Sequence, residues 1–322
     1  MRITLLGPQR RAAAARSAVA DLVPEGPVAA VNAGWLEREA DTRALDDVLG
    51  GRLVNLELHR RWLELREADA ELETGEQWLA ERLAELRTAY RLRLQHSIAA
   101  VRALPQRVRD EQVRAEAEED ALAALRALDA WHLARGAEVR AEQAERLRLQ
   151  EREPVLRHRE DVARLFHRCS GLVVTGGHVG VLLHLLSLFG VAGLITEQPA
   201  EGAPARPVIT WSAGAMALAE RVVLFHDHPP YGERPAEVHA AGIGAYAGIV
   251  PFPHARRRLR LDDRDHIALL ARRLAPSTCL VLTDGSRLDL GDAGTLPPHA
   301  ARLNTDGSVG SGVEAAAGAG AA

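Results

Sequence analysis

Hydrophobic runs and helical patterns alternate along the first sixty residues. Short apolar runs occupy residues 2–6, 27–33 and 52–58, and each is bounded by glycine or proline. Such runs are typical of parallel strands that are buried on both faces. A helical pattern lies between the second and third runs, at residues 37–49. The alternation predicts the first part of an α/β domain over residues 1–59, built on an open, mostly parallel sheet with helices on both faces.

A different pattern extends over residues 60–157, where apolar residues recur at steps of three and four with Arg and Glu between them. The first stripe consists of Leu79, Leu83, Leu86, Tyr90, Leu94, Ile98 and Val101. One apolar face on an otherwise polar segment predicts an amphipathic helix. We expect this helix to end at Pro105, a second to stop near Gly136, and a third stretch to run to about residue 157. The sequence therefore predicts an inserted helical hairpin or three-helix excursion.

The apolar stripe of this insertion has two interpretations. It packs on itself or on the sheet, as surface helices of globular proteins do. Alternatively, it forms a coiled coil with a second chain, since heptad-like spacing with charged flanks also suits an intermolecular seam. The second interpretation makes the protein a homo-oligomer or a partner-binding protein through its helical insertion.

The α/β pattern resumes over residues 158–305. Strands are predicted at 171–177, 206–211, 247–253, 278–284 and 286–292, and helices at 179–190, 213–221 and 262–275. The tail, residues 306–322, is rich in Gly and Ala with almost nothing to bury, so we expect it to be disordered.

The charge and the hydropathy of the chain limit the kinds of partner that we expect it to bind. The 322 residues carry 40 basic and 44 acidic side chains, a net charge of −4, and the arginines are interleaved with glutamates. This gives no basic patch for a phosphate backbone, so we expect no nucleic-acid partner. No apolar run approaches the roughly 20 residues of a membrane span, and the N-terminal run is too short for a secretory signal. We therefore expect a cytoplasmic protein that does not bind a membrane.

Ser212 is the first candidate for chemistry. It lies between a predicted strand and a predicted helix and is followed by Ala213, Gly214 and Ala215. Small neighbours at such a junction fit a nucleophile elbow, in which the serine sits on a sharp, strained turn. A helix N-cap is the alternative, because serine is a preferred capping residue. Thr210 stands where the Gly-x-Ser-x-Gly pattern has its first glycine.

A nucleophilic serine needs a general base and a group that orients that base. His254 follows an apolar run and is the best-placed histidine, although a solvated loop histidine is the alternative interpretation. Asp227 and Glu237 lie between Ser212 and His254 and are candidate orienting acids. The segment 226–228, His-Asp-His, also raises the question of a metal. We expect none, because a hydrolytic zinc site needs a third well-placed ligand and no HExxH spacing occurs.

Gly176 and Gly177 end the strand that precedes the serine segment. Backbone N–H groups at such a bend complete an oxyanion hole with the N–H that follows the nucleophile, although Gly-Gly also ends strands for steric reasons alone. No Gly-x-Gly-x-x-Gly or Walker loop follows the first strand, so we expect no nucleotide cofactor, and no cofactor of another kind is indicated.

Four segments in order, "GLVVTGGHVGVLLHLL", "VITWSAGAMALA", "FHDHPP" and "GIVPFPH", resemble the dipeptidase E and cyanophycinase family of serine peptidases. The resemblance covers residues 1–59 loosely and about 160–310 well, and it does not include the helical insertion. It implies a fold like that of class I glutamine amidotransferases. It also implies that Ser212 is the nucleophile, His254 the general base and Asp227, fifteen residues after Ser212, the orienting acid, with Gly177 and Ala213 as oxyanion donors.

The resemblance further implies a substrate, because the family cleaves short peptides or amides with an acidic residue before the scissile bond. The planar guanidinium of an arginine can bind both oxygens of such a carboxylate. Arg256, Arg257 and Arg258 follow His254 directly and are candidate substrate-binding residues, with solvated surface arginines as the alternative. His178 stands where the family has asparagine, and we count it with the substrate-binding candidates.

Two hypotheses about function follow from these observations. The first is a serine hydrolase, specifically a peptidase that cleaves a small acidic peptide or amide through an acyl-enzyme. The second is a catalytically inactive protein of the same fold that assembles or binds a partner through its helical insertion. A glutamine amidotransferase would need a cysteine at the elbow, and position 212 is serine.

Overall fold

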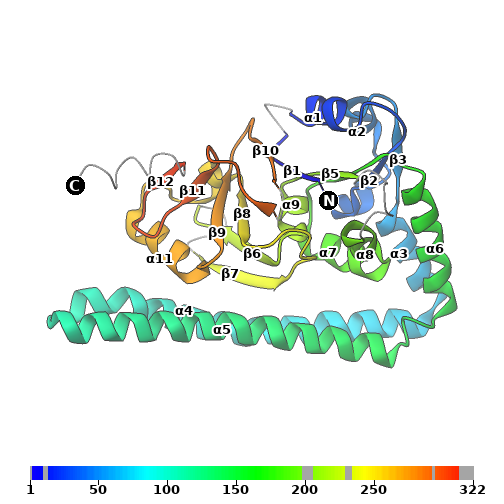
Figure 1. The fold of residues 1–322 in the computed structure, drawn as a ribbon. Helices are drawn as coiled ribbons and strands as arrows, with labels where there is room; N and C mark the ends of the chain where they lie inside the picture. The colour runs from blue at the N-terminus through cyan, green and yellow to red at the C-terminus, as the bar shows by residue number, and fades with distance from the viewer. Residues whose placement is uncertain (1, 10–13, 198–205, 229–233, 292–293, 312–322) are drawn as a thin grey trace.

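The computed structural model describes residues 2–9, 14–197, 206–228, 234–291 and 294–311. An α/β body carries a long helical hairpin along one side (Figure 1). The central sheet has six strands in the order β10-β1-β5-β4-β2-β3. Its strands are β1 Arg2–Leu6, β2 Val28–Val31, β3 Leu53–Asn55, β4 Gly171–Val174, β5 Pro207–Trp211 and β10 Arg287–Asp289.

All strands of this sheet are parallel except β10, which pairs antiparallel with β1. In β1 and β4, successive residues point into different apolar clusters: Leu5 belongs to one and Leu6 to the other, and the same holds for Val174 and Val173. Because side chains alternate across a strand, both faces of the sheet are covered. The predicted mixed α/β fold with a mostly parallel sheet is therefore confirmed.

The helices that build these two layers lie on opposite faces of the sheet. One layer has α1 Ala15–Leu22 and α2 Arg43–Val48. The other includes α3 Leu58–Ala68, α6 Glu153–His167, α7 Val179–Leu188, α8 Val191–Thr196 and α9 Ala213–Leu218. A 3-10 helix, η1 Ala33–Arg38, follows β2.

The later strands do not join the central sheet. β8 Ile249–Pro253 and β9 Thr278–Leu282 are parallel partners in a four-stranded sheet with β11 Ala301–Leu303 and β12 Val309–Ser311. β6 Arg221–His226 and β7 Arg234–Ala241 form a separate antiparallel pair. The expectation of one open sheet is corrected to three sheets. α10 Ala255–Arg258 and α11 Arg264–Leu274 follow β8.

The insertion is a single antiparallel hairpin of two long helices, α4 Ala70–Arg107 and α5 Glu111–Arg146. Two predicted ends are wrong. α4 continues past Pro105 to Arg107, because a proline in the last turn breaks only a terminal hydrogen bond. α5 runs through Gly136, because a glycine in a helix interior costs only about 1 kcal/mol, which packing offsets.

Side chains define both ends of the hairpin. Asp69 caps α4 by accepting a hydrogen bond from the amide of Leu72 at 3.0 Å, and Asp110 caps α5 through the amide of Val113 at 2.9 Å. Arg152, just before α6, holds the Asp69 carboxylate with two hydrogen bonds of 2.6 and 2.7 Å. The guanidinium of Arg152 therefore fixes the chain leaving the hairpin to the start of α4.

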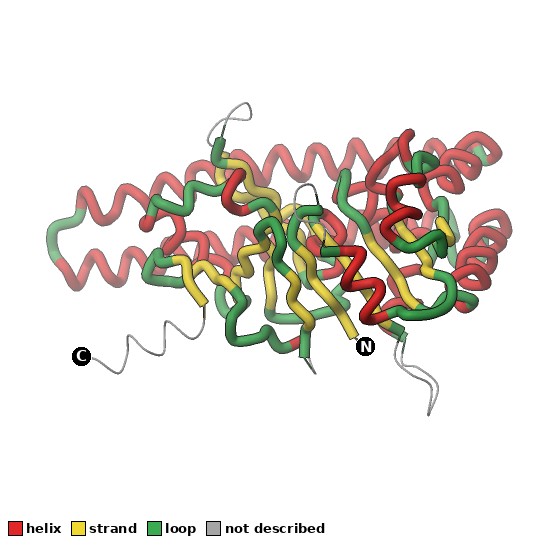
Figure 2. Tube along the Cα trace, turned by 90° about the horizontal axis from the view of Figure 1, so that it is seen from above, coloured by secondary structure: helices red, strands yellow, loops and turns green. Residues whose placement is uncertain are grey.

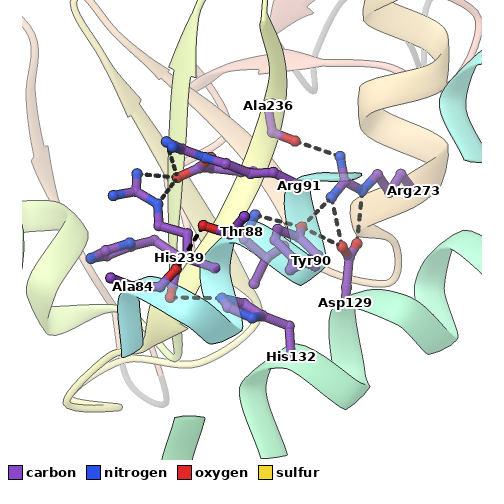
Figure 3. A network of polar contacts seen from close by, with 12 residues as sticks. Ala84, Thr88, Tyr90, Arg91, Asp129, His132, Ala236, His239 and Arg273 are labelled. Atoms are coloured by element: carbon purple, nitrogen blue, oxygen red, sulfur yellow. Dashed lines mark hydrogen bonds and ion pairs between the residues drawn. The ribbon is translucent and has the colours of Figure 1, made fainter. Parts of the chain in front are cut away.

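The hairpin docks on β7 of its own chain through a buried polar network (Figure 3). Arg273 of α11 binds Asp129 of α5 with hydrogen bonds of 2.7 and 2.6 Å, and the Tyr90 hydroxyl donates to the same carboxylate at 2.7 Å. The network reaches β7 where Arg273 donates to the Ala236 carbonyl at 2.6 Å and the Val238 amide donates to Tyr90 at 3.0 Å. The side chains of Tyr90, Asp129 and Arg273 are thus all paired.

Apolar residues of the hairpin complete a cluster that the body begins. The hairpin contributes Tyr90, Leu94, Ile98, Leu125 and Leu128, and the body contributes β6, β7, β8 and α11. Figure 2, viewed from above, has both long helices running along the body. In the structure, the stripe packs within its own chain, as the first interpretation expects. Association of two chains through the hairpin stays a prediction.

The C-terminal boundary also differs from expectation. β12 pairs with β11 at Val309–Ser311, so ordered chain extends beyond residue 306, and the rest of the predicted disordered tail, 312–322, lies outside the described residues. No described helix combines the length and the apolarity needed to span a membrane.

Candidate active site

Ser212 sits on a strained turn between β5 and α9. Its backbone has φ 54° and ψ −123°, a region that a non-glycine residue rarely adopts. Its side chain makes no capping hydrogen bond to α9. The N-cap alternative therefore does not describe Ser212, and the geometry is that of a nucleophile elbow.

Thr210 and Gly214 pack together beneath the elbow. A Cβ on Gly214 would lie 2.4 Å from the Val174 carbonyl oxygen and 2.5 Å from Thr210 Oγ1, so only glycine fits. Thr210 Oγ1 donates to the same Val174 carbonyl at 3.0 Å. Thr210 therefore links β5 to the end of β4 directly beneath the elbow.

His254 lies opposite Ser212 at the end of β8. Its Nε2 is 3.1 Å from Ser212 Oγ, within the reach of a nucleophile and its base. Its backbone is left-handed, with φ 60°, and its amide donates to the Leu282 carbonyl at 3.0 Å. The carbonyl of His254 accepts hydrogen bonds from the amides of Arg257 and Arg258, which starts α10.

The Gly176–Gly177 turn lies against the elbow. A Cβ on Gly176 would be 2.8 Å from the Cβ of Ser212 and 3.6 Å from the amide nitrogen of Ala213. Gly177 has φ 122°, and a Cβ there would lie 2.1 Å from the Gly34 carbonyl oxygen. Ala213 is the first residue of α9, so no carbonyl of its own helix accepts from its N–H. The glycine turn thus packs closely against Ser212 and the first residue of α9.

A cavity of about 840 Å³ opens over Ser212 and His254. Of the three candidate substrate-binding arginines, Arg257 and Arg258 line it, whereas Arg256 is exposed and is not among the lining residues. Arg38 of η1 also lines the cavity and was not predicted from the sequence. Its position follows from the parallel sheet, which brings the chain after β2 to the same edge as the elbow.

Asp227 does not occupy the position expected of an orienting acid. Its Oδ2 is 2.9 Å from His266 Nε2 and accepts from the Arg260 amide at 3.0 Å. Burial raises the pKa of this carboxyl, but the bonds from His266 and Arg260 outweigh it and leave the pKa below its usual value. Asp227 lines a second cavity, of about 600 Å³, beneath the hairpin. The expected link from His254 to Asp227 is replaced by a link to His266.

Two further candidates also face the hairpin. Glu237, the alternative orienting acid, is bound by Arg87 and Arg91 of α4, with Arg91 Nε at 2.5 Å from its Oε2. His178 caps α7 by accepting from the Val181 amide at 3.2 Å, and it lines a third cavity rather than the one over Ser212. Neither side chain is among the residues that line the cavity over Ser212.

The three side chains of the His-Asp-His segment make separate contacts and do not converge on one point. His226 lines the cavity over Ser212 and places Nδ1 2.9 Å from the His228 carbonyl oxygen, while Asp227 turns the other way to His266. Among the described residues, no three His, Cys, Asp or Glu side chains are grouped as a metal site requires.

The sequence was compared with models of known protein families and with curated proteins. No family model matches the chain, and no curated protein matches it significantly.

Proposed function

We propose that the protein is a serine hydrolase with Ser212 as nucleophile and His254 as general base. The observation that carries the proposal is the 3.1 Å separation of Ser212 Oγ and His254 Nε2 on a strained elbow. Strain of this kind costs about 1 to 3 kcal/mol and is typical of functional sites. The cavity of about 840 Å³ over both side chains gives a substrate access to them.

The reaction follows from the atoms in place. Ser212 Oγ attacks a carbonyl carbon while His254 Nε2 takes its proton, and the amides of Gly177 and Ala213 stabilise the oxyanion. His254 returns the proton to the leaving amine as the carbon–nitrogen bond breaks, which leaves an acyl-enzyme. Water, deprotonated by His254, hydrolyses the ester and restores Ser212.

The substrate we propose is a small acidic peptide or amide. Arg38, Arg257 and Arg258 all line the cavity and give it positive charge. Arginine binds a carboxylate with two parallel hydrogen bonds, which fixes orientation as well as affinity. The resemblance to the dipeptidase E and cyanophycinase family, drawn from the segments around Ser212 and His254, points to the same substrate class.

The assembly hypothesis has less support from the packing. The apolar stripe of the hairpin contributes Tyr90, Leu94 and Ile98 to a cluster of its own chain, so these side chains are not available to a second chain. The hydrolase hypothesis needs no such second surface.

Labelling with a fluorophosphonate probe tests the proposal. The wild type should be labelled, and Ser212→Ala should not, because the probe forms a bond with an activated serine oxygen. His254→Gln should label at least about a hundredfold more slowly, the usual contribution of a general base. Ser17→Ala, at an exposed serine of α1, is the matched control and should label like the wild type. An unlabelled wild type, or equal labelling of Ser212→Ala, would overturn the proposal.

A further inference from the structure

A third cavity, of about 660 Å³, separates the hairpin from α7 and β7. Its walls are largely apolar and come from both hairpin helices and from α7, with Leu79, Leu83, Leu133 and Leu183 among the lining residues. Ligand sites are typically apolar concavities of this size with a few polar groups that fix orientation. The hydrolase site uses none of this volume.

Four charged side chains line this cavity, and three of them have partners within the chain. Arg66 binds Glu73, Glu76 binds His184, and Arg87 binds Glu237.

Arg140 of α5 is the exception. Its Nη1 donates to the Gly136 carbonyl at 2.9 Å, and no acidic side chain of the described residues forms an ion pair with it. Burial lowers the pKa of the Arg140 guanidinium, so its charge is partly desolvated. A desolvated charge without a counter-ion costs free energy that an anion from outside would recover.

Gly136 makes room for this arrangement. A Cβ at Gly136 would lie 3.2 Å from Arg140 Nη1, closer than ordinary contact. A glycine in a helix interior costs about 1 kcal/mol relative to alanine. The glycine therefore accommodates a guanidinium folded back along α5 into the cavity.

Two histidines share the polar end of the cavity with Arg140. Burial lowers the pKa of both imidazoles, and together with the charge of Arg87 it brings the pKa of His239 to about 4; the Arg140 charge acts in the same direction on both. Both imidazoles are thus neutral at pH 7. They supply polar surface beside Arg140 without a competing charge.

We propose that the cavity beneath the hairpin binds a small organic carboxylate with an apolar chain, its carboxylate on Arg140 and its chain against the leucines of α4 and α7. The apolar walls suit the chain, and the single unpaired guanidinium among the described lining residues suits one negative charge. This site is independent of the proposed hydrolase activity, because its ligand does not reach Ser212.

Calorimetric titration with octanoate and with octanamide, its neutral isostere, tests the proposal. The wild type should bind octanoate about tenfold more tightly than octanamide, the effect of one charge-assisted contact. Arg140→Gln should remove that preference, and Arg140→Lys should retain most of it. Arg135→Gln, an exposed arginine of the same helix, is the control and should behave like the wild type.

A second pair of variants tests the location. Ala137→Trp, at a lining position of α5, should abolish binding of both compounds by filling the cavity, whereas Ala134→Trp, which faces solvent one position outside the lining, should leave both unchanged. Equal affinity of the wild type for octanoate and octanamide would overturn the proposal. So would no binding of octanoate at millimolar concentration, or a preference that survives in Arg140→Gln.

Discussion

At the scale of single residues, the candidate site depends on two unfavourable backbone conformations. Ser212 and His254 both have positive φ, at 54° and 60°, and neither is glycine. Each such residue costs about 1 to 3 kcal/mol, and it persists only when its surroundings fix it. Thr210 and Gly214 do so beneath Ser212, and the parallel pairing of β8 with β9 does so before His254.

His239 gives the stability of the protein a pH dependence. Burial, followed by the charge of Arg87, lowers its pKa to about 4, against about 6.5 in an unfolded chain. Between these values the unfolded chain binds a proton that the folded chain does not, so stability falls as pH falls. From pH 7 to pH 5 we expect a loss of roughly 2 kcal/mol from this group.

Urea unfolding at both pH values measures this loss. His239→Gln should show a smaller drop between pH 7 and pH 5 than the wild type. His96→Gln, at an exposed histidine of α4, is the control and should keep the wild-type drop. An unchanged drop in His239→Gln would contradict the assignment.

Sequence reasoning predicted the pair Ser212 and His254 but not the position of Asp227. Each residue is recognisable because it directly follows a buried apolar strand, whereas their proximity depends on how two different sheets pack, since β5 and β8 do not share a sheet. The partner of Asp227 is His266, the third residue of an amphipathic helix, which no local pattern marks as a neighbour. His178 was misplaced for a similar reason, because its capping of α7 turns the ring away from the elbow.

At the scale of elements, one contact between the hairpin and the body is a fully buried ion pair. Arg273 and Asp129 are 3% and 4% exposed, so neither charge has water as a substitute partner. Asp129→Asn should lower the free energy of unfolding by about 3 to 5 kcal/mol, because it leaves the Arg273 charge buried and uncompensated. Denaturant unfolding measures this directly.

A double variant distinguishes the cost of the unpaired Arg273 charge from the loss of packing around the ion pair. Asp129→Leu with Arg273→Met should recover much of the stability lost in Asp129→Asn, since no charge then remains to be desolvated. Glu138→Gln breaks the exposed pair with Arg135 and should change stability by less than about 1 kcal/mol. If Asp129→Asn behaves like Glu138→Gln, the network does not hold the hairpin.

The sequence predicted the elements of the central sheet to within a few residues, and it missed β6 and β7 entirely. Strands buried on both faces have continuous apolar runs, as in β4 and β5. β7 instead carries Glu237 and His239 toward the hairpin, and its register with β6 shifts twice. The apolar positions that alternate with them are mostly alanine, and alanine, glutamate and proline have low strand propensity, so the segment is not conspicuous as a strand.

At the scale of the whole molecule, the hairpin is a structural part of the body. Five of its buried side chains belong to the cluster with β6, β7, β8 and α11, and each contributes about 1.5 to 3 kcal/mol. Their sum, roughly 10 kcal/mol, equals the entire stability of a typical domain. This docking was one of two interpretations of the stripe, since an apolar face does not specify which surface covers it.

Removing the hairpin should therefore disrupt the fold. Replacing residues 70–146 with a short Gly-Ser linker should give a protein that binds 8-anilinonaphthalene-1-sulfonate and lacks a cooperative thermal transition. Replacing only the tip, residues 104–115, where no side chain is buried, should leave the melting temperature within a few degrees of the wild type. A cooperative transition in the protein without residues 70–146 would contradict this docking role.

Gly177 and His178 are consecutive residues that line different cavities. The His178 amide donates to the Gly34 carbonyl at 2.7 Å on the side of the elbow, while its imidazole lines the cavity under the hairpin. Two consecutive residues thus form part of the wall between two cavities. Thermodynamic linkage requires any influence across such a wall to be reciprocal: the free energy by which one occupant changes the affinity of the other is the same in both directions.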